Sequence, residues 1–452
     1  MGRPVRFLLV DPINTRDAVQ TYFPHLGLGY LASRLRQEFG SGVEFRVIQG
    51  HVAPWIHSWE PDIVGITSVS EHYDLAAMYA KVCKYDGLPV IAGGVHISTV
   101  PQSLSEDMDV AVVGEGEQTM VDLMRLFLSE GSLPPAQLSQ IRGVAFRQDG
   151  KLVTTPPRAP VEPLDSLPMP ARDIVKVKPH TSMFTSRGCP YRCVYCVSSR
   201  FWGKARFFSA DYVVEEIDWL YRTYGVREIS LLDDLFIADV GRMVAIRDGL
   251  ARKNLLGRLS FVCHVRSSLV SEYVARLLHD LGVKVVGIGI ETGSQTTLHY
   301  LKGGVTVEEQ ARAIEVLRRH GIDPHPSFII GAPEESLADL RQTECFIKEN
   351  RITHFEAYVL IPFPGTPLWD DAKARGLVTD TMNWGRLAWN FGANRDPVIL
   401  ASRLRRDEIV RFYRKLMGRR KRYIRQAQAT ALLRQCVSDP VSMARGIWRR
   451  VW

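Results

Sequence analysis

The chain has 452 residues, of which 46% are apolar, and a formal net charge of +8. This length predicts about two to three domains with hydrophobic cores of their own. No apolar run reaches the roughly 18 residues of a membrane-spanning helix, and residues 1–10 lack the apolar core of a signal peptide. We therefore expect a cytoplasmic protein whose thiols stay reduced.

Positive charge is concentrated at the C-terminal end of the chain. Residues 401–452 hold 15 Lys and Arg against 3 Asp and Glu, which leaves 42 basic and 46 acidic residues in the rest. A mildly acidic body disfavours a nucleic-acid-binding protein, and we expect no nucleic-acid partner.

The first 154 residues alternate short apolar strands with helices. The strands are expected at 5–10, 43–48, 62–67, 89–92 and 109–113, with helices at 26–39, 73–83 and 117–127. This pattern predicts an α/β domain with a doubly wound, Rossmann-like parallel sheet, followed by a hairpin that turns at Asp149 and Gly150. Such sheets bind ligands at the carboxyl ends of their strands, where turns at 11–14, 67–70, 93–96 and 114–117 fall.

A proline-rich linker at 155–178 leads into a second alternating series. Its strands are expected at 183–186, 228–232, 259–263, 284–290, 326–330 and 355–360, with helices between them. Six such units predict a partial TIM-type barrel over 179–370, with its chemistry at the strand carboxyl ends. Residues 371–452 are expected to form an extension with a basic helical tail. The aromatic residues around its start, Trp369, Trp384, Trp389 and Phe391, are expected to pack as core rather than to line a pocket.

Three cysteines follow the first barrel strand at C-x3-C-x2-C spacing. Thiolates are soft ligands that suit iron–sulfur clusters, and Cys189, Cys193 and Cys196 would leave the fourth iron of a cubic cluster open. A zinc site would need a fourth ligand, for which His180 is the nearest candidate, and disulfides would leave an odd thiol because the chain has seven cysteines. Unliganded thiols are the remaining alternative.

The cysteine loop, with Tyr195 before the last cysteine, resembles the signature of the radical SAM enzymes. The resemblance implies a [4Fe-4S] cluster whose open iron binds S-adenosylmethionine (SAM), and cleavage of SAM by an electron to a 5′-deoxyadenosyl radical. Matching positions at later strand ends imply further SAM contacts, by Tyr195, Asp233, Asp234, Arg266, Glu291 and Ile330. Alternatively, Asp234 or Asp239 caps a helix and Arg266 makes a structural ion pair.

The N-terminal segments 24–32, 61–66, 92–96 and 113–117 resemble the cobalamin-binding domain of class B radical SAM enzymes. This resemblance implies that cobalamin lies between the two domains, against Asp11, Pro12, Leu26, Gly27, Ser68, Gly93, Gly94, Val95, Gly114, Glu115 and Gly116. The chain lacks the Asp-x-His-x-x-Gly loop that supplies a histidine below cobalt in methionine synthase, and His96 is expected to be a loop residue.

The resemblance implies an enzyme that methylates an unactivated carbon, using a 5′-deoxyadenosyl radical and methylcobalamin. The alternatives are cyclisation, ring contraction or carbon-skeleton rearrangement without methyl transfer, and a non-catalytic corrinoid-binding regulator. The expected partners are a small-molecule or lipid-like substrate and an electron donor such as flavodoxin or ferredoxin.

The basic tail has an apolar stripe at helical spacing, formed by Ile409, Phe412, Tyr413, Leu416 and Met417. With Trp448 and Trp452 at the end, it is typical of helices that lie at the surface of an anionic membrane. We expect contact with the inner face of the membrane or with an acidic partner. The alternative is that the helix packs on the barrel.

Overall fold

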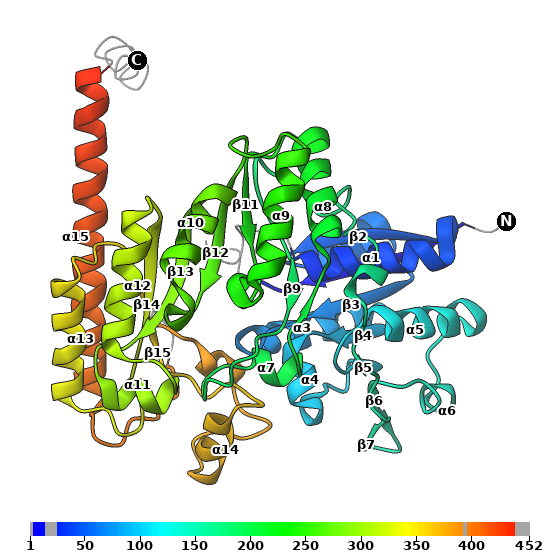
Figure 1. The fold of residues 1–452 in the computed structure, drawn as a ribbon. Helices are drawn as coiled ribbons and strands as arrows, with labels where there is room; N and C mark the ends of the chain where they lie inside the picture. The colour runs from blue at the N-terminus through cyan, green and yellow to red at the C-terminus, as the bar shows by residue number, and fades with distance from the viewer. Residues whose placement is uncertain (1–2, 14–24, 392–395, 439–452) are drawn as a thin grey trace, which may run out of the picture.

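The computed structural model describes residues 3–13, 25–391 and 396–438, which form two α/β units side by side (Figure 1). The first unit is built on a seven-stranded sheet in the order β2-β1-β3-β4-β5-β6-β7. Its strands are β1 (Val5–Asp11), β2 (Val43–Gln49), β3 (Ile63–Thr67), β4 (Val90–Gly93), β5 (Val110–Val112), β6 (Val144–Gln148) and β7 (Lys151–Thr154). The first five are parallel and the last two form an antiparallel hairpin, so the strand order reverses beside β1, where such sheets have their ligand crevice.

Helices cover both faces of this sheet. They are α1 (Leu26–Phe39), α2 (Ala53–Trp59), α3 (Tyr73–Tyr85), α4 (Val95–Thr99), α5 (Glu117–Glu130) and α6 (Pro135–Leu138). Phe7, Leu8, Leu9 and Val10 of β1 are all at most 1% exposed. A strand buried on both faces is continuously apolar rather than alternating, which explains why this segment is so easy to recognise.

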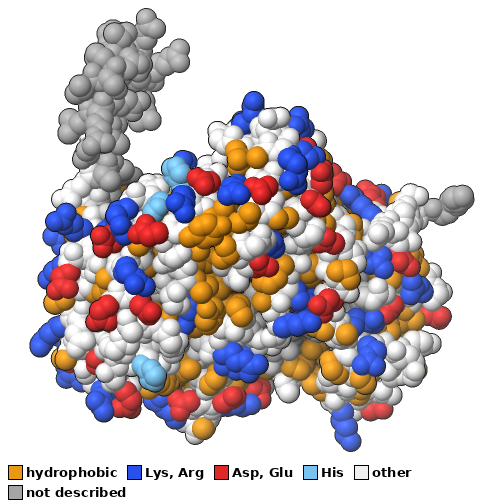
Figure 2. Space-filling view, in the orientation of Figure 1, with side chains coloured by type: hydrophobic (Ala, Val, Ile, Leu, Met, Phe, Trp, Pro, Cys, Tyr) orange, Lys and Arg blue, Asp and Glu red, His pale blue; other side chains and the backbone are white. Residues whose placement is uncertain are grey.

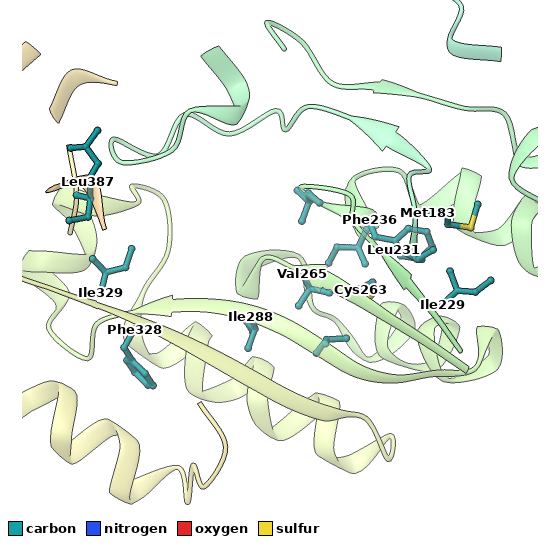
Figure 3. Packing of buried hydrophobic residues seen from close by; sticks show 14 of the residues in the cluster. Met183, Ile229, Leu231, Phe236, Cys263, Val265, Ile288, Phe328, Ile329 and Leu387 are labelled. Atoms are coloured by element: carbon teal, nitrogen blue, oxygen red, sulfur yellow. The ribbon is translucent and has the colours of Figure 1, made fainter. Parts of the chain in front are cut away.

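The second unit is a six-stranded parallel sheet in the order β15-β14-β13-β12-β11-β8. Its strands are β8 (His180–Met183), β11 (Glu228–Leu231), β12 (Ser260–Val265), β13 (Val283–Glu291), β14 (Asp323–Ile330) and β15 (Glu356–Val359), and its helices are α7 (Ser198–Phe201), α8 (Ala210–Tyr224), α9 (Val240–Arg252), α10 (Glu272–Leu281), α11 (Gln295–Leu301), α12 (Val307–Arg319) and α13 (Leu337–Glu349). Figure 3 shows side chains from neighbouring strands, such as Leu231, Val265 and Ile288, gathered in one buried layer. This arrangement is the expected partial barrel.

The first barrel strand lies three residues earlier than the sequence predicts. We expected it at 183–186, whereas β8 ends at Met183 and a separate short strand, β9 (Ser186–Arg187), pairs with β10 (Arg206–Phe207). The chain leaves the sheet because the backbone N–H groups of Thr185 and Ser186 donate to Asp233 Oδ1, at 2.6 and 3.1 Å, instead of to a strand. A carboxylate distant in the sequence therefore ends the strand.

The C-terminal extension crosses back onto the first unit through α14 (Pro367–Ala374) and the 3-10 helix η7 (Trp384–Leu387). The backbone N–H groups of Trp384 and Gly385 donate to Asp74 Oδ2 on α3, at 2.9 and 3.3 Å. Trp369 stacks on Trp384 with ring centroids 5.8 Å apart, and both are buried, as expected of core residues. The other two aromatic residues of this region, Trp389 and Phe391, are half-buried. We call residues 367–387 the strap.

The last helix, α15 (Arg406–Ser438), begins on the barrel and extends beyond it (Figure 1). Ile409, Tyr413 and Leu416 are buried and Phe412 and Met417 half-buried, so the apolar stripe packs on the body and is not free to enter a bilayer. This is the alternative that the sequence left open. Trp448 and Trp452 lie outside the described residues. Among the described residues no helix is long and apolar enough to cross a membrane, and Figure 2 shows basic and acidic side chains interspersed on one face.

Candidate cluster and cofactor site

A cavity of about 550 Å³ lies where the two units meet. One wall is the carboxyl edge of the first sheet, and it contains every residue that the sequence predicts to contact cobalamin: Asp11, Pro12, Leu26, Gly27, Ser68, Gly93, Gly94, Val95, Gly114, Glu115 and Gly116. The opposite wall comes from the second unit and consists of Phe184, Ser186, Arg187, Phe201, Trp202, Leu232 and Asp234. Of the residues predicted to contact SAM, the cavity lining includes Asp234.

Two glycines of the first wall are required by close packing within the first unit. Gly94 has φ +95°, and a Cβ there would lie 2.7 Å from the Ser68 carbonyl oxygen. A Cβ on Gly65 would lie 3.0 Å from the Phe7 ring. Position 94 requires glycine because of its left-handed φ and position 65 because of crowding. The broad apolar lining and the glycine edge fit a large cofactor such as cobalamin.

The three loop cysteines are half-buried, and the turn that holds them is closed by Cys196 N–H donating to the Cys193 carbonyl at 3.2 Å. Burial raises the pKa of the Cys189 thiol, and that of Cys196 to about 11, so a bound metal would be needed to hold them as thiolates. In the described ranges no three His, Cys, Asp or Glu side chains are close enough to hold a single ion. The donor set, three soft ligands on one loop, fits a multi-iron cluster.

The structure separates the two adjacent carboxylates that the sequence could not distinguish. Asp233 is 1% exposed; its Oδ1 accepts the two backbone N–H groups that end β8, and its Oδ2 accepts the Thr185 hydroxyl. Asp234 lines the cavity, and its Oδ2 accepts from Ser198 Oγ at 2.5 Å. Desolvation, together with the Asp233 charge, raises the pKa of Asp234. Asp234 is thus the carboxylate available to a ligand, whereas Asp233 holds the fold.

Glu291 is brought together with the cysteine loop by a hydrogen bond of 2.8 Å from the Tyr195 hydroxyl. Lys302, which is 5% exposed, lies 3.3 Å from the same carboxylate oxygen and donates to the Gly289 carbonyl. Glu291 has φ +66°, and the register of β13 with β14 shifts at this point. Left-handed backbone at a buried non-glycine residue is costly and is concentrated at functional sites, which favours a role for Glu291 in binding.

Arg266 and Ile330 complete the set of predicted SAM contacts. Arg266 Nη1 lies 3.7 Å from Cys193 Sγ, so this residue contacts the cluster loop itself. The Ile330 side chain is buried in the core, and its carbonyl accepts from Leu360 N–H at 2.8 Å. Their contacts to SAM stay predictions, as do those of Tyr195, Asp233, Asp234 and Glu291.

A network of four buried charges joins the two units beside the cavity. Arg187, two residues before Cys189, donates to Glu117 Oε1 at 2.5 Å and lies 3.4 Å from Glu115 Oε1. Glu115 also accepts from Arg206 and from Val161 N–H. Burial works to lower the pKa of Arg187, but the charges of Glu117 and Glu115 outweigh it and raise the pKa. We call Arg187, Arg206, Glu115 and Glu117 the clamp.

Sequence reasoning missed most of the second wall and the clamp. Phe201 and Trp202 follow the cysteine loop within six residues, and this aromatic pair was the one local signal that could have found them. Nothing local indicates that Arg187 meets an acidic turn 70 residues earlier. The cavity also contains His25 and His72, which we did not single out.

His96 is fully buried and both of its ring nitrogens are engaged. Nε2 lies 3.0 Å from Ser103 Oγ, whose own proton is donated to the Val100 carbonyl. Nε2 must therefore carry the hydrogen, and Nδ1 accepts from Ser70 Oγ at 3.0 Å. The ring packs between Tyr73 and Trp384 of the strap. His96 lies in α4 and is buried, so the expectation of a loop residue was wrong; its contacts leave no nitrogen for cobalt.

Burial lowers the pKa of His96 to about 3, against 6.5 for a free histidine. The unfolded chain then binds a proton more readily than the folded chain, so stability is complete above pH 6.5 and falls as the pH drops toward 3. We expect this group to remove roughly 2–3 kcal/mol from the free energy of unfolding by pH 4.5. Denaturant unfolding of wild type and His96→Gln at pH 7 and pH 4.5 measures it, and equal pH dependence in the two proteins would contradict the expectation.

Comparison with known proteins agrees with this geometry. Residues 183–347 match the radical SAM superfamily, and residues 15–124 match the B12 binding domain. An uncharacterised methyltransferase of Pyrococcus horikoshii is 31% identical over 436 residues, which cover 91% of each chain.

Two solved structures share the fold. The cobalamin-dependent SAM radical enzyme OxsB has a TM-score of 0.68 at 17% identity, over 86% of this chain but 64% of that longer chain. The methyltransferase TsrM of Kitasatospora setae has a TM-score of 0.67 at 22% identity, over 83% of this chain and 77% of TsrM. With both domains matched in order, the chain belongs to the cobalamin-dependent branch of the radical SAM superfamily, whose cofactors are a [4Fe-4S] cluster, SAM and cobalamin.

Proposed function

We propose that this protein is a methyltransferase that adds a methyl group to an unactivated carbon of a small molecule. The observation that carries the proposal is that one cavity has the cobalamin-type sheet edge on one wall and residues near the cysteine loop on the other. Radical methylation needs both cofactors to reach one substrate carbon, because reacting atoms must approach to about 3–3.5 Å.

When bound, the cluster with SAM supplies a 5′-deoxyadenosyl radical and cobalamin supplies the methyl group. The protein's part is to place these groups and to exclude water. Asp234 offers a carboxylate to a ligand ammonium, and Tyr195 with Lys302 holds Glu291 in its strained position. The apolar wall formed by Phe184, Phe201 and Leu232 shields the cavity, which protects a reactive radical from solvent.

The test is anaerobic reconstitution of the full chain with iron, sulfide and hydroxocobalamin, followed by incubation with a reductant and SAM that carries a trideuteriated methyl group. We expect 5′-deoxyadenosine, S-adenosylhomocysteine and cobalamin that carries the labelled methyl group, and transfer of that group to a compound in a small-molecule extract. SAM cleavage without any labelled product would favour cyclisation or rearrangement. No SAM cleavage at all would favour a non-catalytic corrinoid-binding protein.

The proposal includes an external electron donor of the flavodoxin or ferredoxin type and a cytoplasmic location. It also includes contact of the basic tail with an anionic surface. Because the apolar stripe of α15 is packed on the body, this contact would be made by the exposed cations: Arg411, Arg414, Lys415, Lys421, Arg422 and Arg425. Each basic group near an anionic bilayer contributes about 1 kcal/mol.

Flotation with phosphatidylserine vesicles tests the tail. We expect the full chain to bind at low salt and to be released at high salt, and a chain truncated after residue 400 to bind much less, because screening weakens purely electrostatic contact. Equal binding by the two chains, or binding that resists salt, would contradict the proposed role.

A further inference from the structure

Arg266 contacts the cluster loop at two points. It follows β12 directly and is 6% exposed, and its Nη1 donates to Cys193 Sγ at 3.7 Å. Its guanidinium also lies over the ring of Tyr191, 3.9 Å from the centroid. Tyr191 and Cys193 both belong to the loop that carries the three cysteines, so one buried cation is fixed against this loop.

The other two nitrogens of Arg266 are held by the surrounding barrel. Nε donates to Ser268 Oγ at 3.2 Å, and Nη2 donates to the Gly303 carbonyl at 2.7 Å. Each nitrogen therefore has a partner within the protein, and the guanidinium plane is fixed without any ligand. An arginine placed to bind a ligand carboxylate would have Nη1 and Nη2 without partners in the protein. In Arg266 these two nitrogens donate to a cysteine sulfur and a backbone oxygen.

A fixed cation that donates to a cluster thiolate changes the energy of the cluster. Reduction adds a negative charge, and a buried positive charge stabilises the reduced state more than the oxidised state. Hydrogen bonds to the cysteine sulfurs have the same effect and are a main determinant of cluster potentials.

We propose that Arg266 is a positioning residue that raises the reduction potential of the cluster through Cys193, rather than the partner of the SAM carboxylate. The inference rests on the cluster and not on methyl transfer, because its readout is the cluster potential in the absence of substrate. A higher potential makes the electron that starts the radical reaction easier to accept from an external donor.

The test compares wild type, Arg266→Gln and Arg266→Lys, each as the full reconstituted chain. The matched control is Arg276→Gln, since Arg276 on α10 also lies over a tyrosine ring, at 5.8 Å, but is exposed and away from the loop. The midpoint potential is measured by redox titration followed by electron paramagnetic resonance, without SAM. The dissociation constant of SAM is measured separately by equilibrium binding.

We expect the glutamine variant to have a more negative midpoint potential, the lysine variant an intermediate one and the control the wild-type value, with SAM affinity changed by less than about threefold in all. If Arg266→Gln assembles no cluster, the lysine variant decides, because it keeps the charge but loses the fork geometry. Wild-type potential in both variants overturns the proposal. If SAM binding then weakens about tenfold, Arg266 serves SAM; if only cluster content falls, its role is structural.

Discussion

Replacing Cys189, Cys193 and Cys196 together with alanine is expected to abolish cluster binding and every trace of SAM cleavage. No other cysteine can substitute among those whose side chains the structure describes, because Cys83 and Cys263 are buried in the cores of the two sheets and Cys345 is exposed on α13. Iron and sulfide content, the visible absorption of the cluster and the yield of 5′-deoxyadenosine from reconstituted protein measure the loss.

The control for the cysteine experiment is Cys345→Ala, which removes an exposed thiol away from the loop and should leave iron content and SAM cleavage unchanged. Circular dichroism should show that the triple variant stays folded, since the three thiols are only half-buried without a cluster. Iron content near the wild-type value in the triple variant would sink the cluster assignment.

Breaking the clamp is expected to have the largest effect on stability. Arg187→Met leaves Glu117 and Glu115 buried against a single arginine, and an uncompensated buried charge costs about 3–5 kcal/mol of unfolding free energy. The double variant Arg187→Met/Glu117→Met should regain most of this loss, because a buried ion pair replaced by packed apolar side chains is often neutral. Denaturant unfolding of the cofactor-free proteins measures both changes.

An exposed ion pair supplies the comparison for the clamp. Arg319 and Glu272 lie 2.5 Å apart with more than half of each side chain exposed, so Arg319→Met should cost less than about 1 kcal/mol. If Arg187→Met is no more destabilising than Arg319→Met, the clamp does not hold the units together. If the double variant is as unstable as the single one, lost packing rather than lost charge balance is the cause.

The fold was predictable wherever its cause is local. Helix α8 was expected between two barrel strands, and Ser209 caps its N-terminus while Gly225 ends it in a left-handed conformation; both signals are visible in the sequence. The predicted cobalamin wall lines one cavity because turns that follow parallel strands share one edge. Strand β8 was misplaced because its end is set by Asp233, about 50 residues later.

The site was predictable only to the level of residue types. Two neighbouring aspartates are equivalent in a sequence motif, and only their hydrogen-bond partners distinguish Asp233 from Asp234. Similarly, Glu115 matches a cobalamin signature, yet its carboxylate oxygens accept from Arg206 and from Val161 N–H. A pattern of residues records which positions matter but not which contact each one makes.

The strap and the clamp have different consequences for recombination between related enzymes. In the strap, backbone N–H groups donate to Asp74, and backbone groups are present whatever the sequence of residues 384 and 385. To keep the strap contact, a chimaera that takes its first unit from a relative therefore needs an acceptor at position 74 and no particular side chain at 384 or 385. The clamp places two acidic side chains on one unit and two arginines on the other. Hybrid proteins that keep the four clamp charges should fold. A hybrid in which only the barrel is exchanged should not fold if its clamp charges differ from those of the first unit.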